Sequence, residues 1–202
     1  MKRLNETLQF YEENAETFSS GTMNADMNSA RERFLSRLPQ QAYILDLGCG
    51  SGRDTKAFLD AGCKVDAVDG SRELCRIASG YTGIPVKEML FQDLAAEKVY
   101  DGIWACASIL HMPKTELLET VKKIGLALKA DGVFYASFKY GTFEGMRKGR
   151  YFTDFTEETL SEFWKDIPSL RITETWITQD VRPGREKEQW INLLAECIQE
   201  VE

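Results

Sequence analysis

A glycine-rich segment flanked by carboxylates is the part of this chain best suited to chemistry. It reads Leu45-Asp46-Leu47-Gly48-Cys49-Gly50-Ser51-Gly52-Arg53-Asp54. Its glycines let the backbone turn tightly and let a ligand approach without a Cβ in the way. Asp69 follows about twenty residues later, and an ionised carboxylate, which only accepts hydrogen bonds, suits the hydroxyls of a ribose. With a third acid at Asp93, this spacing favours a nucleotide-like ligand over an empty turn between a strand and a helix.

The loop departs from two common nucleotide motifs. The dinucleotide fingerprint has a glycine three residues after Gly50, where this chain has Arg53. A P-loop would continue with Gly-Lys-Ser or Gly-Lys-Thr, and this loop does not. An NAD-linked oxidoreductase is therefore the weaker alternative, also because Asp93 supplies a third acid.

The elements that must position this loop alternate between strand and helix. Short apolar runs such as Tyr43–Leu47 predict buried strands, and Gly62 would close the helix after the loop in a left-handed cap. Strands are expected at 43–47, 65–69, 86–91, 103–108 and 133–138, and helices at 54–60, 72–79, 113–131 and from Thr156 onward. This alternation predicts an α/β fold, a doubly wound and mostly parallel sheet with helices on both faces.

Three patterns in the second half of the sequence extend this prediction. The helix at 113–131 is expected to bury a stripe of Leu117, Val121, Ile124 and Leu128. Arg171–Thr178, which is rich in Thr, Ile and Trp, predicts a strand. The apolar residues between 190 and 198 fit helical spacing, although the same run also fits a strand buried on both faces.

Composition and charge argue against several classes of protein, although a local basic patch would leave RNA as a disfavoured substrate. Lys+Arg total 25 against 32 for Asp+Glu, and the net charge of −7 disfavours a broad clamp on nucleic acid or on an anionic membrane. No apolar run is long enough to span a membrane, and the first residues do not form a secretory signal. Five cysteines without a C-x-x-C pair and a single histidine predict reduced thiols, no metal site and a cytoplasmic location.

Four motifs in order resemble those of the class I S-adenosylmethionine-dependent methyltransferases. Asp46 to Gly52 resembles their motif I, and Val68-Asp69-Gly70-Ser71 resembles their acidic second motif. Phe91-Gln92-Asp93-Leu94 is similar to the third motif, and Tyr100 through His111 to the fourth. The resemblance implies S-adenosylmethionine as cofactor, S-adenosylhomocysteine as product and a seven-stranded sheet whose last strand is antiparallel beside the fifth. On this ground residues 190–197 are expected to be a strand, against their helical periodicity.

The resemblance also implies a division of the chain and a set of site residues. A single domain over 1–202 would comprise an N-terminal helical cap (1–40), a cofactor-binding half (41–140), and an acceptor-side lid with C-terminal strands (141–202). The implied cofactor site comprises Tyr11, Asp46, Gly48, Cys49, Gly50, Arg53, Asp69, Gly70, Ser71, Gln92, Asp93, Leu94, Ala105 and Cys106.

Each part of the cofactor is assigned a partner by the same resemblance. Asp46 and the amides at 48–50 would hold the methionine end, and the backbone at Ala105 or Cys106 would lie near its ammonium group. Asp69 would accept from both ribose hydroxyls. Gly70 and Ser71 would line the adenine, Asp93 would accept from its amino group, and the Leu94 amide would face its ring.

Two of these residues, Arg53 and Tyr11, keep an alternative interpretation. Arg53 could reach the methionine carboxylate or could be an ordinary arginine on a helix surface. The segment Phe10–Phe18 is similar to an N-terminal helix of small-molecule methyltransferases that folds an aromatic residue over the cofactor. An ordinary amphipathic helix with Phe10 and Phe18 in the core explains that segment equally well.

The acceptor side is expected near His111 and between Lys139 and Arg150. In-line methyl transfer needs alignment and exclusion of water, and a base only if the acceptor is protonated. His111 is the candidate base or positioning group, or else a helix-entry residue bonded to backbone. Cys106 lies in an apolar setting and is a poor nucleophile. The cations and glycines between Lys139 and Arg150 indicate a mobile lid over an anionic acceptor, or alternatively a solvated basic loop.

The predicted function is methyl transfer to a small-molecule acceptor. Ala105-Cys106-Ala107-Ser108 stands where enzymes that methylate amino groups of nucleic acids carry Asn/Asp-Pro-Pro-Tyr/Phe, which argues against that substrate class. A protein that binds S-adenosylmethionine without catalysis remains the alternative.

Overall fold

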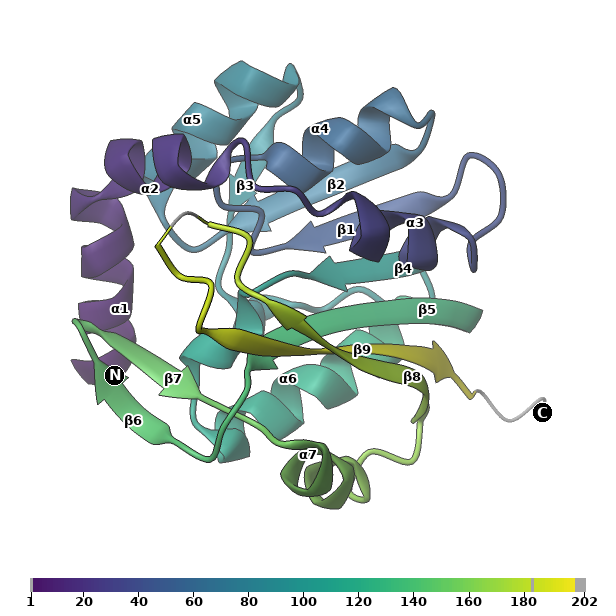
Figure 1. Cartoon of the computed structure of the whole chain (residues 1–202). Helices are drawn as coiled ribbons and strands as arrows, with labels where there is room; N and C mark the ends of the chain where they lie inside the picture. Colours follow the sequence, from purple (N-terminus) through teal and green to yellow (C-terminus); the bar gives the residue numbers. More distant parts are fainter. Residues whose placement is uncertain (1, 183, 199–202) are drawn as a thin grey trace.

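The computed structural model describes residues 2–182 and 184–198, and it describes residues 2 and 3 by their backbone alone. A seven-stranded sheet runs through its centre in the order β3-β2-β1-β4-β5-β9-β8 (Figure 1). The strands are β1 (Tyr43–Leu47), β2 (Lys64–Asp69), β3 (Val86–Glu88), β4 (Tyr100–Ala105), β5 (Leu128–Lys139), β8 (Leu170–Gln179) and β9 (Gln189–Cys197). Strands β1 to β5 pair in parallel, whereas β9 is antiparallel to both β5 and β8. The predicted fold and its antiparallel last strand are confirmed.

Helices cover both faces of the sheet because its central strands bury alternate side chains on opposite sides. Leu45 of β1 belongs to the apolar cluster beneath α6 (Lys114–Ala127) and α7 (Glu157–Trp164). Its neighbour Ile44 belongs to the cluster beneath α3 (Asn28–Leu35) and α4 (Arg53–Asp60), and α5 (Arg72–Thr82) packs on β2. Burial on both faces explains why these strands read as continuous apolar runs.

Two N-terminal helices and a hairpin lie beyond the carboxyl ends of the parallel strands. The helices are α1 (Lys2–Glu13) and α2 (Ala15–Thr22), and the hairpin consists of β6 (Glu144–Arg147) and β7 (Arg150–Thr153). Figure 1 shows β7 beside α1, and Tyr151 N donates a hydrogen bond to Thr7 Oγ1 at 3.0 Å. Much of the predicted lid is thus a hairpin that contacts α1.

Several element boundaries differ from the sequence prediction. The third strand ends at Glu88, and Phe91–Asp93 forms a 3₁₀ turn. The fourth strand ends at Ala105 rather than at residue 108. Leu128 continues the helical spacing of α6, yet it begins β5 and pairs with Tyr100 of β4, because strand pairing prevails over the periodicity there.

Residues 190–197 form a strand, as the family resemblance implies and the periodicity does not. The side chains of residues 191–195 are all buried, because β9 lies between two other strands and contributes to the apolar clusters on both faces of the sheet. A strand buried on both faces carries no alternation, so its apolar residues also fit a helical spacing by chance.

Within the described part of the chain, no helix is long and apolar enough to cross a bilayer. The same residues contain no group of three or more His, Cys, Asp or Glu side chains that could hold a metal ion. All five cysteines are free thiols. A cytoplasmic location stays a prediction.

Candidate active site

A cavity of about 450 Å³ lies at the carboxyl ends of the parallel strands. The ends of β1, β2, β4 and β5 form one wall, and α1, α2, β7 and the β8–β9 connection form the other. The strand order reverses between β1 and β4, which is where open α/β sheets leave a crevice for ligands. The volume falls within the range of about 300–1,000 Å³ typical of small-molecule and cofactor sites.

The glycine-rich loop after β1 is attached to β2 by its own backbone amides. Gly48 N and Cys49 N both donate to the Val68 carbonyl, at 2.9 and 3.0 Å. Gly50 N donates to Asp69 Oδ2 at 2.9 Å. Each of these amides thus has an acceptor within the protein, and its role at the methionine end of the cofactor stays a prediction.

The backbone conformation of the loop explains its glycines. The φ angles of Gly48 and Gly50 are +83° and +56°, in the left-handed region that side chains disfavour. A Cβ on Gly48 would lie 2.5 Å from Ser108 Cβ, whereas one on Gly50 would lie 3.2 Å from the Phe18 ring. Both glycines line the cavity. The loop thus gives the cavity a backbone surface that a side chain at either position would obstruct.

Asp69 ends β2 and presents its carboxylate at the cavity wall. Its Oδ1 accepts from Ser71 N and its Oδ2 from Gly50 N, both at 2.9 Å. Burial raises the pKa of Asp69 above its usual range, although these backbone donors act in the opposite direction. An ionised carboxylate has about four acceptor sites, so two remain for a diol in the cavity.

Gln92 offers a second acceptor at the cavity wall. Its Oε1 is buried and has no hydrogen-bond partner among the described residues. An unsatisfied buried acceptor is costly unless a ligand or water completes it. Its amide oxygen fits a donor such as the amino group of an adenine. The carboxylate of Asp69 and the partly exposed backbone at Gly50 line the same cavity.

Four predicted cofactor residues do not line the cavity. Ser71 is the N-cap of α5, where its hydroxyl accepts from Leu74 N. Asp93 has an exposed side chain, while Leu94 and Ala105 are 4% and 0% exposed within the apolar core. The 3₁₀ turn at 91–93 presents Gln92 to the cavity and Asp93 to solvent. The motif therefore indicates the right segment, but Gln92 and not the predicted Asp93 faces the cavity.

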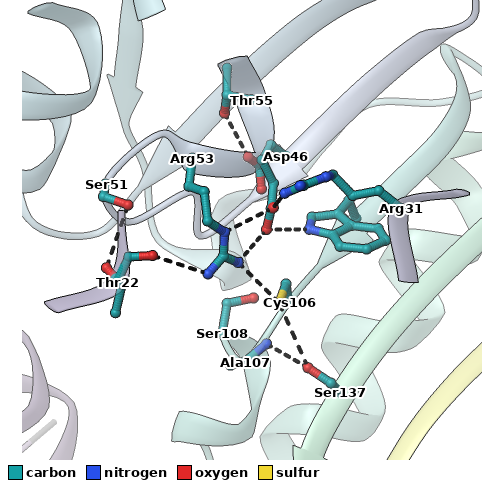
Figure 2. Close-up of polar contacts among 12 residues, drawn as sticks. Thr22, Arg31, Asp46, Ser51, Arg53, Thr55, Cys106, Ala107, Ser108 and Ser137 are labelled. Carbon is teal, nitrogen blue, oxygen red and sulfur yellow. Dashed lines mark hydrogen bonds and ion pairs between the residues drawn. The ribbon is translucent and has the colours of Figure 1, made fainter. Parts of the chain in front are cut away.

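Arg53 lies on the wall but is engaged by the protein. Its Nε and Nη2 donate to the two carboxylate oxygens of Asp54, at 3.0 and 2.6 Å. Figure 2 shows its guanidinium between Thr22 and Cys106, whose carbonyl oxygen and Sγ it contacts at 3.4 and 3.6 Å. Arg31 also pairs with Asp54, at 2.6 Å. The structure thus uses Arg53 to join α2, α4 and the end of β4, and does not leave it free for a methionine carboxylate.

The charge state of this network follows from its geometry. Burial alone would raise the pKa of Asp54, but the guanidinium groups of Arg53 and Arg31 outweigh it and hold that pKa below the usual range. Asp46, which also lines the cavity, accepts from Thr55 Oγ1 at 2.6 Å. Burial and the nearby charge of Asp54 raise the pKa of Asp46 to about 7. A cationic group beside Asp46 would restore its ionised form.

Tyr11, His111 and Arg150 meet on the opposite wall. His111 Nδ1 lies 2.6 Å from the Tyr151 carbonyl, which can only accept, so Nδ1 carries the proton. Nε2 therefore accepts from the Tyr11 hydroxyl at 2.7 Å, and Arg150 Nη1 donates to the same hydroxyl oxygen at 3.3 Å. Burial lowers the pKa of His111 to about 4, so the ring is neutral at pH 7. The structure brings both predicted residues, Tyr11 and His111, into one chain of hydrogen bonds.

The far end of the cavity contains residues that the sequence did not indicate. They come from β8, β9 and their connection: Trp176, Thr178, Asp180, Arg182, Trp190 and Asn192. Lys139 Nζ lies 3.3 Å from Asp180 and 4.2 Å from the centre of the Trp190 ring. No local motif marks these residues, because their position depends on β9 pairing beside β5.

Sequence comparisons identify methyltransferases. A family model described as a methyltransferase domain matches residues 44–132. The N-terminal Xaa-Pro-Lys N-methyltransferase 1 of Xenopus tropicalis is 31% identical over 126 residues, which are 54% of this chain and 56% of that protein. The ubiquinone biosynthesis O-methyltransferase of Xanthomonas axonopodis pv. citri is 29% identical over 120 residues, 55% of this chain and 49% of that protein. The chain spans about half the length of these curated relatives.

Structural comparison finds the same fold. The 1,6-didemethyltoxoflavin-N1-methyltransferase of Burkholderia thailandensis, solved with bound 1,6-didemethyltoxoflavin and S-adenosylhomocysteine, is 21% identical. It superposes with a TM-score of 0.74 over 95% of this chain and 85% of that one. The [4+2]-cyclase SpnF, 13% identical, gives 0.71 over 96% and 95% of the two chains. The matched family model runs from β1 to the start of β5, and the whole sheet has the fold of the solved methyltransferase, so the comparisons support the class I S-adenosylmethionine-dependent methyltransferase family that the four motifs resemble.

Proposed function

We propose that this protein transfers a methyl group from S-adenosylmethionine to a small-molecule acceptor. The observation that carries the proposal is the cavity at the reversal of strand order, with the Asp69 carboxylate on its wall. S-adenosylmethionine, when bound, supplies an electrophilic methyl group on a sulfonium. What the protein must add is binding, alignment and exclusion of water.

Three side chains would hold the cofactor. Asp69 would accept from the ribose hydroxyls, and Gln92 Oε1 would accept from the adenine amino group. Asp46 would lie beside the ammonium group of the methionine end, and that cation would offset the burial that now raises the pKa of Asp46 to about 7. Gly48 and Gly50 would supply a surface without side chains against which the cofactor can pack.

His111 fits a positioning role better than the role of a general base. Its Nδ1–H is directed at the Tyr151 carbonyl and its Nε2 accepts from Tyr11. With a pKa near 4 it has little affinity for a proton at pH 7. It would fix the Tyr11 ring over the cavity, where the edge-to-face contact with Phe18, with ring centres 5.0 Å apart, holds it from the other side.

The enclosure of the cavity supports a small acceptor. Helices α1 and α2, strand β7 and the β8–β9 connection all contribute wall residues opposite the glycine loop. The relatives above include enzymes named for a protein N-terminus, for ubiquinone biosynthesis and for 1,6-didemethyltoxoflavin. Because these relatives are named for different acceptors, similarity to them does not identify the acceptor of this protein. The argument for a small molecule is that wall residues surround the cavity on both sides.

A second candidate is a cofactor-binding protein that does not transfer the methyl group. One of the structural neighbours is named a [4+2]-cyclase, so this fold also hosts other reactions.

Two measurements test the proposal. Calorimetry with S-adenosylhomocysteine, S-adenosylmethionine and NAD should show binding of the first two alone. Radiolabelled methyl transfer from S-adenosylmethionine should then appear in a small-metabolite extract and not in a protein or RNA fraction. No binding of S-adenosylhomocysteine would contradict the cofactor site. Binding without any labelled product would favour the non-catalytic candidate, and label in the protein fraction would contradict the small acceptor.

A further inference from the structure

We propose that the acceptor is an organic anion and that the Arg150 guanidinium is its binding group. The inference rests on the proposed methyltransferase function and specifies its substrate class. It comes from the position and the unused hydrogen-bonding capacity of one arginine at the start of β7. The sequence alone indicated a cluster of cations between residues 139 and 150 and an anionic acceptor as one interpretation, without distinguishing Arg150 from Arg147.

Arg150 is held rigidly at the cavity wall by aromatic rings. Its guanidinium carbon lies 4.4 Å from the centre of the Phe10 ring, 5.2 Å from that of Phe152 and 5.7 Å from that of Tyr11. Cation–π contacts of this kind orient the group while leaving the N–H edge available. The position of the guanidinium is thus fixed before any ligand arrives.

The hydrogen-bonding capacity of Arg150 is largely unused. Its Nε is buried and has no partner among the described residues. Its Nη1 makes only the 3.3 Å contact with the Tyr11 hydroxyl. A buried N–H without an acceptor is unfavourable, and the missing acceptor is supplied most simply by an oxygen of a bound ligand.

The other cations of the cavity wall differ from Arg150 in having acidic partners. Arg53 pairs with Asp54, and Arg182 pairs with Asp180 at 2.5 Å. Lys139 also pairs with Asp180, and Arg185 lies 4.0 Å from Glu188. In the described ranges no Asp or Glu oxygen lies within 4.0 Å of the Arg150 guanidinium.

The neighbouring arginine of the same hairpin provides an internal contrast. Arg147 pairs with Asp154 at 2.8 Å and stacks on Phe143 and Phe152, and it does not line the cavity. Of the two hairpin arginines, therefore, Arg150 has both access and an unneutralised charge. An arginine edge with free Nε and Nη donors matches the two oxygens of a carboxylate or phosphate.

The test uses the smallest probes of the proposed chemistry, so that shape cannot decide the outcome. Acetate and its neutral isostere acetamide are titrated into the protein, free and with S-adenosylhomocysteine, at constant ionic strength. The readout is the ¹H–¹⁵N signal of each arginine Nε, with the Arg150 signal assigned by its loss in Arg150→Lys. We expect a saturable shift of that signal with acetate and none with acetamide, while the Arg53 and Arg147 signals stay in place.

Variants separate ligand binding from a structural role. The chain has a single histidine, so the His111 ring signals report on the neighbourhood of Arg150 without ambiguity. Acetate should move them in the native protein and in Arg147→Gln. In Arg150→Lys, which keeps the charge and loses the paired donors, binding should weaken by about tenfold.

Two results would overturn the inference. An Arg150 signal indifferent to acetate would assign that residue a purely structural role between α1 and β7, and equal shifts at all arginines would indicate non-specific screening. Neither result depends on cofactor binding, because the free protein is titrated as well. Failure of the proposed function would instead appear as absent S-adenosylhomocysteine binding in the same samples.

Discussion

The two walls of the cavity are built in different ways. The wall at the ends of β1 and β2 is held by backbone groups, as in the hydrogen bonds of Gly48 and Cys49 to the Val68 carbonyl. The opposite wall joins α1 to β7 through side chains, such as Tyr11 with His111 and Arg150. A backbone-held wall presents nearly the same surface whatever side chains surround it, whereas the side-chain wall can be rebuilt by a few substitutions. The first suits a constant cofactor and the second a variable acceptor.

The largest effect that this comparison predicts comes from a side chain in the backbone-held wall. Gly50→Val should lower the affinity for S-adenosylhomocysteine by at least about a hundredfold, because φ is +56° there and the new side chain would point toward Phe18 and the cavity. Calorimetry measures the loss, and circular dichroism checks the fold.

Gly62→Val is the matched control for that change. Its φ is +84°, and apart from its chain neighbours no heavy atom lies within 4 Å of the point that a Cβ would occupy. The variant therefore has the same backbone strain without the ligand surface. We expect reduced thermal stability and nearly native cofactor affinity. Equal loss of affinity in both variants would show that strain, and not obstruction of the site, was being measured.

The next effect concerns the carboxylate that links the loop to the cofactor. Asp69→Ala removes the acceptor for two ribose hydroxyls, and hydrogen bonds to charged groups are worth about 1.5–3 kcal/mol each. It also releases Gly50 N and Ser71 N. Cofactor affinity by calorimetry should fall by about a hundredfold or more, with a smaller loss in Asp69→Asn. Unchanged affinity in Asp69→Ala would remove this residue from the ribose site.

A smaller effect depends on pH and on Asp46. The pKa of about 7 in the ligand-free fold lies above the unfolded value, so Asp46 destabilises the fold increasingly as pH rises from about 4 to 7. A bound ammonium group favours the ionised form. The thermal shift caused by S-adenosylhomocysteine should therefore be larger at about pH 8 than at about pH 5.5. Asp46→Asn should flatten that difference, and a pH dependence that survives in the variant would assign it to another group.

The smallest effect is expected in the hairpin of the side-chain wall. Its contact with α1 includes the hydrogen bond from Tyr151 N to Thr7, so it is ordered without a ligand. Amide hydrogen exchange over residues 141–153 should slow by about tenfold or less with S-adenosylhomocysteine and further with an acceptor. No change with either would show that the hairpin is a fixed wall and does not close as a lid.

The contrast between the walls also explains what the sequence predicted. The glycine loop and Asp69 are close in sequence and in space, and their spacing alone indicated a nucleotide-like site. Asp93 was placed on the cavity because its motif is local, but the 3₁₀ turn there presents Gln92 instead. Whether residue 92 or residue 93 of the turn faces the cavity depends on the packing around Phe91, and no sequence pattern shows that packing.

The side-chain wall was harder to predict because distant segments create it. Tyr11 and His111 were both candidates, yet nothing in their spacing of one hundred residues indicated a mutual hydrogen bond. The different roles of Arg147 and Arg150 likewise depend on the register of the hairpin, in which the two residues face each other across the turn. The fold itself was predicted well where strands alternate with helices, and β9 needed the family resemblance.

The position of β9 has a consequence for the order in which this protein can fold. The parallel pairing of β1 with β4 and the antiparallel pairing of β5 with β9 both join distant residues, such as Ile44 with Gly102 and Phe134 with Ala195. Strand β9 is the last strand of the sheet to be synthesised, and it must insert between β5 and β8. Such long-range pairings close large loops and form slowly. During synthesis the glycine loop and Asp69 can reach their places while the β8–β9 rim is still missing. A chain interrupted before residue 189 would thus keep the segments of the cofactor wall, expose two unpaired strand edges to aggregation, and lack the end of the cavity that contains Trp190 and Asn192.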